Sequence, residues 1–198
     1  MKRVFVSQRV DIVEAYAERR DALDQNWAPF LLACGALLCA VPNHAATLAQ
    51  LLLHARPHGI VLTGGNSPLL CGGNAPERDA TDTALIAYAA ENKTPLIGVC
   101  RGMQSIVTFF GGSLRPVQGH VAVSHPVAGG MARVVNSYHE LAVDALPGVL
   151  KACAKSEDGL VEAVRHESLP ILGIMWHPER EAAFNAQDIA LFKEMFST

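Results

Sequence analysis

One segment of the chain, residues 95–104, combines the residue types that nucleophilic catalysis needs. A buried-looking apolar run meets a helical segment at Cys100, with Gly98 two residues before it and Gly102 two residues after it. This G-x-C-x-G spacing at a strand–helix junction indicates a nucleophile elbow, and the helix N-terminus favours the thiolate. The alternative is an inert cysteine, because cysteine is among the most buried residue types. The glycine spacing favours the nucleophile.

A cysteine nucleophile needs a general base and a group that orients the base. His177 follows the apolar run 171–176 and precedes Pro178 and Glu179. We expect Pro178 to keep this segment extended, so that Glu179, two residues after His177, turns toward the imidazole. On its own, the tripeptide more often marks a surface loop. With the elbow upstream, we predict a catalytic triad of Cys100, His177 and Glu179.

Backbone amides can stabilise the oxyanion that forms when a thiolate attacks a carbonyl. The N–H of Arg101, directly after the nucleophile, is one expected donor. Gly64-Gly65 follows another apolar run, 59–63, and in α/β sheets the sites lie at the carboxyl ends of the strands. This glycine pair lacks the spacing of a phosphate-binding loop. We therefore predict an oxyanion hole formed by the backbone of Gly65 and Arg101.

The elements that would position these residues alternate between short apolar runs and helical segments, as in a mostly parallel sheet covered by helices. We expect the charged stretch 14–24 to be a loop that leads into a helix starting near Asp24, and Asp79 to cap the helix predicted at 80–91. The predicted strands are 4–6, 37–41, 59–63 and 95–99, and the predicted helices are 45–55, 80–91 and 102–110.

The last third of the chain changes character, with several strands and little helix between them. Glu157-Asp158-Gly159 suits a hairpin turn, and one amphipathic helix is expected at 188–196. We predict one α/β domain over residues 1–198, a mostly parallel sheet flanked by helices with extra antiparallel strands in this region. These strands are 121–123, 133–135, 150–154, 160–164 and 171–176.

Composition narrows the function classes. The chain has 198 residues, 50% of them hydrophobic, and a net charge of −3, which excludes intrinsic disorder. Its 16 basic and 19 acidic residues argue against nucleic-acid binding. The most apolar stretch, 27–41, is shorter than the ~20 residues of a membrane span. Met1-Lys2-Arg3 leads directly into a strand-like run, so no secretory signal is expected. We therefore expect a small-molecule substrate and no membrane partner.

The five cysteines are odd in number and contain no C-x-x-C pair, which predicts reduced thiols in a cytoplasmic protein. Cys71, in a Gly-rich loop without a helix behind it, is expected to be an exposed thiol. Two interpretations are equally compatible with three arginines, Arg9, Arg19 and Arg78. Each could contact a substrate carboxylate or phosphate, or be a solvated loop charge.

Two histidine pairs have spacings that invite a metal-site interpretation. His54 and His58 are four residues apart, but Pro57 breaks the helix between them. His120 and His125 have an odd spacing, which places them on opposite faces of a strand. We therefore predict no metal site.

Four motifs occur together in this chain: T-G-G at 63–65, G-V-C-R-G-M-Q at 98–104, N-S-Y-H at 136–139 and W-H-P-E-R at 176–180. In order and spacing they resemble the class I glutamine amidotransferase superfamily, and most of all its free-standing γ-glutamyl hydrolase branch, which includes γ-glutamyl-γ-aminobutyrate hydrolase. A narrower likeness is to the γ-glutamyl-CDP-amidate hydrolases. The resemblance covers nearly the whole chain.

The resemblance implies a flavodoxin-like fold, a Cys–His–Glu triad at Cys100, His177 and Glu179, and no metal or organic cofactor. It also implies that Gln104 and His139 help to hold the γ-glutamyl group, and we assign the neighbouring Ser137 and Tyr138 to the same substrate site. Where family members often carry Asn or Gln, this chain has Glu140. That side chain would either disfavour an anionic substrate or point to solvent.

We therefore expect a hydrolase that cleaves a γ-glutamyl amide through a glutamyl-thioester on Cys100, releasing glutamate and an amine. Two alternatives stay open. One is a glutaminase subunit that delivers ammonia to a separate synthase. The other is a catalytically silent binding or regulatory protein on the same scaffold, against which the complete triad argues. Both a homodimer and a complex with a synthase partner are compatible with the sequence.

Overall fold

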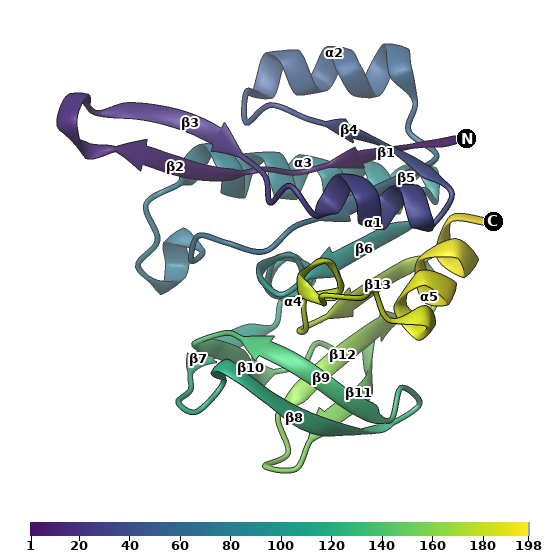
Figure 1. Ribbon diagram of the computed structural model, residues 1–198. Helices are drawn as coiled ribbons and strands as arrows, with labels where there is room; N and C mark the ends of the chain where they lie inside the picture. Colours follow the sequence, from purple (N-terminus) through teal and green to yellow (C-terminus); the bar gives the residue numbers. More distant parts are fainter. Residues whose placement is uncertain (198) are drawn as a thin grey trace.

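The computed structural model describes residues 1–197, and its centre is a nine-stranded sheet (Figure 1). In chain order its strands are β1 (Lys2–Val6), β4 (Ala36–Ala40), β5 (Gly59–Leu62), β6 (Leu96–Val99), β8 (Val121–Gly129), β9 (Arg133–Tyr138), β11 (Leu150–Ser156), β12 (Val161–His166) and β13 (Ile171–Ile174). Their spatial order is β4-β1-β5-β6-β13-β12-β11-β8-β9. The first five run parallel, and every later pairing is antiparallel. The predicted α/β class with antiparallel additions is confirmed.

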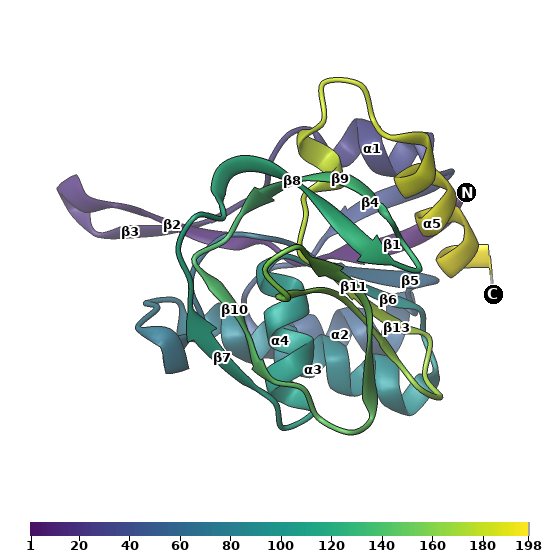
Figure 2. The same cartoon turned by 90° about the horizontal axis from the view of Figure 1, so that it is seen from below.

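Helices cover both faces of the parallel strands (Figures 1 and 2). They are α1 (Trp27–Ala33), α2 (Ala45–Ala55), α3 (Pro76–Asn92), α4 (Arg101–Phe109) and α5 (Ala186–Ser197). Alternating strand residues feed two cores, because successive side chains of a strand point to opposite faces. Val4 and Val6 pack with α1 and α5, whereas Phe5 packs in the core that holds α2, α3 and α4. The central strands β5, β6 and β13 are thus buried on both sides.

The predicted helices are found, with starts that differ from the predicted ones by up to four residues. α2 has the predicted bounds, whereas α3 begins at Pro76. Proline suits a first helical turn because its missing N–H would have no partner there. Asp79 therefore lies inside the helix, and its carboxylate accepts a hydrogen bond from the Leu69 N–H at 3.0 Å. The prediction that Asp79 caps the helix is wrong.

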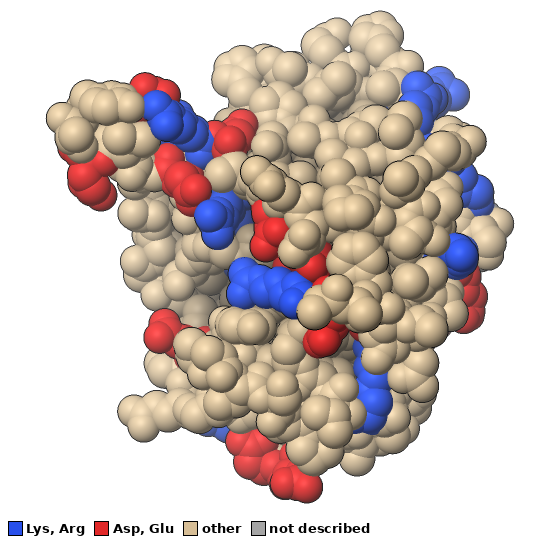
Figure 3. Space-filling model, viewed as in Figure 1, with Lys and Arg blue, Asp and Glu red and all other residues tan. Residues whose placement is uncertain are grey.

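The charged stretch 14–24 is largely a strand hairpin, not the predicted loop. β2 (Arg9–Val13) and β3 (Glu18–Ala22) pair in antiparallel register around the short 3₁₀ turn η1 (Glu14–Tyr16). The hairpin projects from the body of the molecule, and side chains of both charge signs lie along it (Figures 1 and 3). Most of its side chains face solvent, so the apolar alternation that marks a half-buried strand is weak.

Two further strands were not predicted. β7 (Ser113–Pro116) and β10 (Leu141–Ala145) form a small antiparallel sheet beside α4. Among residues 1–197, no helix is both long enough and apolar enough to cross a membrane.

Candidate active site

Cys100 lies in the tight turn between β6 and α4, with φ 51° and ψ −105°. A non-glycine residue with positive φ is strained, and such residues gather at functional sites. A Cβ on Gly98 would lie 2.5 Å from the backbone of Gly102, and a Cβ on Gly102 would lie 2.2 Å from the carbonyl oxygen of Leu62. Both glycines are therefore required for the close approach of the three segments, as the elbow pattern predicts.

His177 and Glu179 are both buried, and 2.7 Å separates Nδ1 of His177 from Oε1 of Glu179. The predicted proximity is confirmed, but the predicted extended segment is wrong. Pro178–Arg180 forms a 3₁₀ turn, η3, three residues after the end of β13. This turn carries the Glu179 carboxylate back to the ring.

The groups around His177 stabilise a charged imidazole. Burial disfavours the charge on His177, but hydrogen bonds with Cys100 and Glu179 outweigh burial and raise the pKa of His177 to about 9. His177 is thus an imidazolium at neutral pH, beside the Cys100 sulfur.

Asn136, in β9, holds the backbone of His177 on both sides. Its Oδ1 accepts a hydrogen bond from the His177 N–H at 2.8 Å, and its Nδ2 donates to the His177 carbonyl oxygen, also at 2.8 Å. Asn136 was not among the predicted site residues, although Asn136 is the first residue of the N-S-Y-H motif. Two residues further on, the ring of Tyr138 meets the His177 ring edge-on, with centroids 5.6 Å apart.

A cavity of about 280 Å³ opens beside Cys100. The structure brings most of the predicted site residues to its wall, together with the exposed Glu140. The predicted residues that line it are Gly65, Cys100, Arg101, Gln104, Tyr138 and His139. Arg101 is the first residue of α4, so its N–H has no acceptor within the helix.

Arg78 lies fully buried beneath the loop that follows β5. Its guanidinium donates to the carbonyl oxygens of Thr63 (2.6 Å), Gly64 (2.9 Å) and Gly65 (3.1 Å). Burial lowers the pKa of Arg78 to about 10, which leaves it charged at neutral pH. Both predicted roles of Arg78 are therefore wrong, because it holds the loop 63–65 in place from inside.

The other two arginines lie at the surface, where Arg9 pairs with Asp11 at 3.1 Å and Arg19 with Glu77 at 2.6 Å. Cys71 is half-buried rather than exposed, and burial raises the pKa of its thiol.

Two residues of the N-S-Y-H motif face protein groups. Ser137 is fully buried, donates to the His120 carbonyl oxygen at 2.8 Å and lies outside the wall of the cavity. The His139 ring meets the carbonyl oxygen of Leu141 through Nδ1 (3.1 Å) and lies 3.4 Å from Glu162 Oε1 through Nε2. His139 thus contributes to the wall while both of its nitrogens face the protein.

His120 and His125 lie on the same side of β8, with ring centroids 4.9 Å apart. The prediction of opposite faces is wrong because a β-bulge intervenes at Ala122, which has φ 55°. The pairing moves from Val121 opposite Tyr138 to Val123 opposite Ser137, so one extra residue reverses the alternation.

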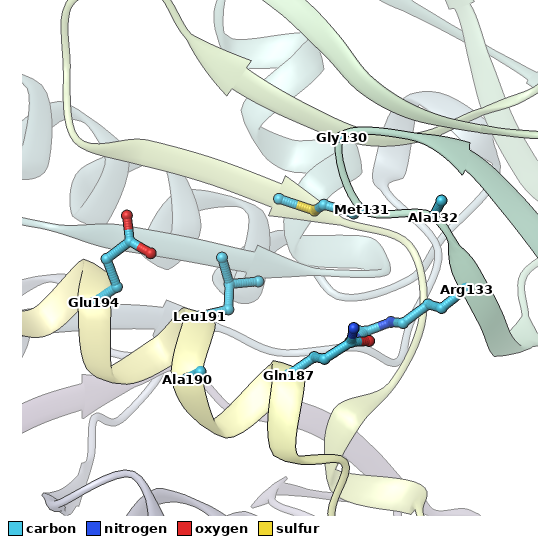
Figure 4. Close-up of a pocket in the computed structure, with 8 residues that line it drawn as sticks. All are labelled: Gly130, Met131, Ala132, Arg133, Gln187, Ala190, Leu191 and Glu194. Carbon is cyan, nitrogen blue, oxygen red and sulfur yellow. The ribbon is translucent and has the colours of Figure 1, made fainter.

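A second hollow, of about 310 Å³, lies between the Gly130–Ala132 turn and α5 (Figure 4). Arg133 at its edge donates to Gln187 and Asp188 and packs over the Trp176 ring at 4.9 Å. This hollow contains no triad residue, and the charge of Arg133 is balanced within the protein.

Comparison with known proteins decides the family. The model of the class I glutamine amidotransferase family matches residues 20–196. The chain belongs to this family. The resemblance predicted from the motifs is confirmed, and it places the chain among hydrolase and amidotransferase enzymes.

Family members with different reactions are similar to the chain. It is 33% identical to the γ-glutamyl-CDP-amidate hydrolase of Campylobacter jejuni (70% of this chain, 69% of that protein) and 32% identical to the γ-glutamyl-γ-aminobutyrate hydrolase of Escherichia coli K12 (88% and 83%). It is 34% identical to anthranilate synthase component 2 of Azospirillum brasilense (80% and 83%). A solved Thermoplasma acidophilum structure, described as a GMP synthase subunit, shares the fold, with TM-score 0.74, 22% identity and coverage of 100% and 94%.

Proposed function

We propose that the protein hydrolyses a γ-glutamyl amide through a thioester on Cys100. The observation that carries this proposal is the strained elbow cysteine beside an imidazole that a buried carboxylate holds at 2.7 Å. The similarity to two γ-glutamyl hydrolases supports the same substrate class.

In the first half-reaction the Cys100 thiolate attacks the γ-carbonyl carbon, and a carbon–sulfur bond forms. The backbone N–H groups of Gly65 and Arg101 stabilise the resulting oxyanion. As the carbon–nitrogen bond breaks, His177 gives its proton to the leaving nitrogen, and the amine departs. The raised pKa of His177 means that this proton is already in place at neutral pH.

In the second half-reaction His177, now neutral, takes a proton from water, and the hydroxide attacks the thioester. The carbon–sulfur bond breaks, glutamate leaves, and the thiolate–imidazolium pair is restored. Glu179 keeps the imidazole oriented and stabilises its charge in both steps. We propose that Gln104 and Tyr138 contact the substrate from the wall of the cavity, whereas Ser137 and His139 support that wall from behind.

A second candidate function is a glutaminase subunit that passes ammonia to a synthase. The similarity to anthranilate synthase component 2 favours it. The two functions differ in the partner that they need. A glutaminase rate that rises many-fold with a co-purifying synthase would support the subunit, whereas full turnover of a larger γ-glutamyl conjugate by the chain alone supports the hydrolase.

The proposal is tested by release of glutamate from glutamine, γ-glutamyl-aminobutyrate and γ-glutamyl nucleotide amidates. We expect Cys100→Ala to abolish turnover and to prevent labelling by a diazoketone analogue of glutamine, while the fold is kept. Cys71→Ala is the matched control, because Cys71 is a half-buried thiol outside the cavity wall. Turnover retained by Cys100→Ala would refute the mechanism.

A further inference from the structure

Four side chains that the proposed reaction does not use converge between β8, β12 and the end of β9. They are His120, His125, His139 and Glu162, and each offers one ligand atom within 4.8 Å of the others. From Oε1 of Glu162 the distances are 3.4 Å to Nε2 of His139, 3.8 Å to Nε2 of His125 and 3.9 Å to Nδ1 of His120. His120, His139 and Glu162 are buried, and His125 is mostly so.

The atoms that face the centre of this cluster have no hydrogen-bond partner within the described chain. They are the three inward ring nitrogens and both carboxylate oxygens of Glu162. Glu162 is 1% exposed. A buried carboxylate without a partner is costly, and five unpaired polar atoms around one point indicate a missing group.

The outward nitrogen of each histidine meets an oxygen acceptor. His120 Nε2 lies 3.0 Å from the Asp158 carboxylate, His125 Nδ1 lies 3.3 Å from the Pro126 carbonyl oxygen, and His139 Nδ1 lies 3.1 Å from the Leu141 carbonyl oxygen. A carbonyl oxygen and an ionised carboxylate oxygen both only accept, so the outward nitrogen of each ring carries a hydrogen. In a ring protonated only at that outward position, the inward nitrogen presents a lone pair to the centre of the cluster. Metal-binding histidines are oriented in this way by their outer partners.

We propose that this cluster binds one divalent transition-metal ion, with zinc as the best fit. Three imidazoles and one carboxylate are ligands that zinc accepts, whereas calcium and magnesium prefer oxygen alone. Bonds of about 2.0–2.2 Å in a tetrahedron place ligand atoms about 3.3–3.6 Å apart. The distances from Glu162 Oε1 start within that range and exceed it by a few tenths of an ångström, which small side-chain rotations remove.

The site has four protein ligands and little exposure, which is the pattern of a structural metal site with no open position. It ties β8 and β12 to the residue after β9. His139 stands between Tyr138 and Glu140, which line the cavity beside Cys100. The bound ion would therefore fix this wall of the cavity without touching the reacting atoms.

The test uses the full chain, purified without a histidine tag. We expect about one zinc per chain by elemental analysis. Removal of zinc by a chelator should lower the melting temperature, and added zinc should restore it. Cobalt(II) added to the metal-free protein should give the intense visible absorption of a tetrahedral site.

His125→Asn and Glu162→Gln should each lose the stoichiometric metal and the effect of the chelator. His54→Asn is the control, because His54 is an exposed histidine on α2. Two results together would overturn the proposal. The wild-type protein would take up no stoichiometric zinc or cobalt at micromolar concentration, and the chelator would leave its melting temperature unchanged. Metal uptake that persists in His125→Asn and Glu162→Gln but disappears in Cys100→Ala would overturn it as well, because the thiol would then be the ligand.

Discussion

Asn136 brackets His177: its amide oxygen accepts from the His177 N–H and its amide nitrogen donates to the His177 carbonyl, each at 2.8 Å. The strand β9, from the antiparallel part of the sheet, thereby positions a residue that follows the parallel strand β13. The position of His177 thus depends on the antiparallel part of the sheet.

Asn136→Ala removes both of these buried hydrogen bonds. We expect the free energy of unfolding to fall by about 1–3 kcal/mol, because a buried N–H and a buried C=O lose their partners. Since the His177 ring loses its fixed orientation, kcat should fall while KM changes less. Steady-state kinetics and urea unfolding measure the two effects. Asn92→Ala is the control, because Asn92 makes an exposed bond to the Tyr88 carbonyl; an equal loss of kcat there would contradict the role of Asn136.

Glu179→Gln tests the source of the raised His177 pKa. The carboxylate is one of the groups that raise this pKa to about 9, so its removal lets the pKa fall toward the ordinary value of about 6.5. The imidazolium then titrates at lower pH, and the alkaline limb of the pH–rate profile should move to lower pH. We expect kcat to drop by about 10²- to 10⁴-fold. Glu167→Gln, at a surface ion pair with Lys151, should leave the profile unchanged.

Gly64→Ala tests the fit between the loop 63–65 and the His177 ring. A Cβ at Gly64 would lie 2.4 Å from Cε1 of His177, so the ring or the loop must move. A displacement of about 1 Å can cost about 10²-fold in rate, and we expect a loss of kcat of that size. Gly148→Ala is the control, because a Cβ there meets nothing within 4 Å. Unchanged kcat in Gly64→Ala would mean that the loop yields freely.

Arg78→Met leaves the carbonyl oxygens of residues 63–65 without their shared donor. We expect the free energy of unfolding to fall by about 2–4 kcal/mol, because hydrogen bonds from a charged donor are strong. Activity of the folded fraction should also fall, because the loop 63–65 loses the hydrogen bonds that fix its position. Chemical denaturation and kinetics below the unfolding transition separate the two effects. Arg115→Met, at an exposed position of β7, should change neither quantity.

Glu140→Gln tests discrimination on the amine side of the substrate. Glu140 is exposed and lines the cavity, so we expect its charge to disfavour anionic leaving groups. We expect the ratio of kcat/KM for γ-glutamyl-aminobutyrate to that for glutamine to rise by up to about fivefold, since an exposed charge contributes about 1 kcal/mol at 4 Å in water. The increase should shrink at high salt. A ratio that does not move would show that Glu140 faces away from the leaving group.

The predictable parts of the fold share a clear physical signal. Helix 45–55 and the buried strands around Cys100 have strong apolar patterns, and the elbow glycines have a fixed spacing. The hairpin β2–β3 was not predicted, because it buries little apolar surface and so lacks a clear apolar pattern. The bulge at Ala122 was not predicted because no residue type requires it. It places His120 and His125 on the same side, where the sequence predicted opposite faces. The burial of Arg78 beneath residues 63–65 depends on tertiary contacts that local patterns do not contain.

The backbone of Cys100 carries a consequence for the evolution of the family. A side chain at φ 51° and ψ −105° costs on the order of 1–3 kcal/mol, a strain that glycine would not have. Cys100→Gly should therefore yield an inactive protein that is more stable than its parent. A lineage that no longer needs catalysis would gain stability by drifting toward glycine at this position, so the elbow sets activity and stability in opposition at a single residue.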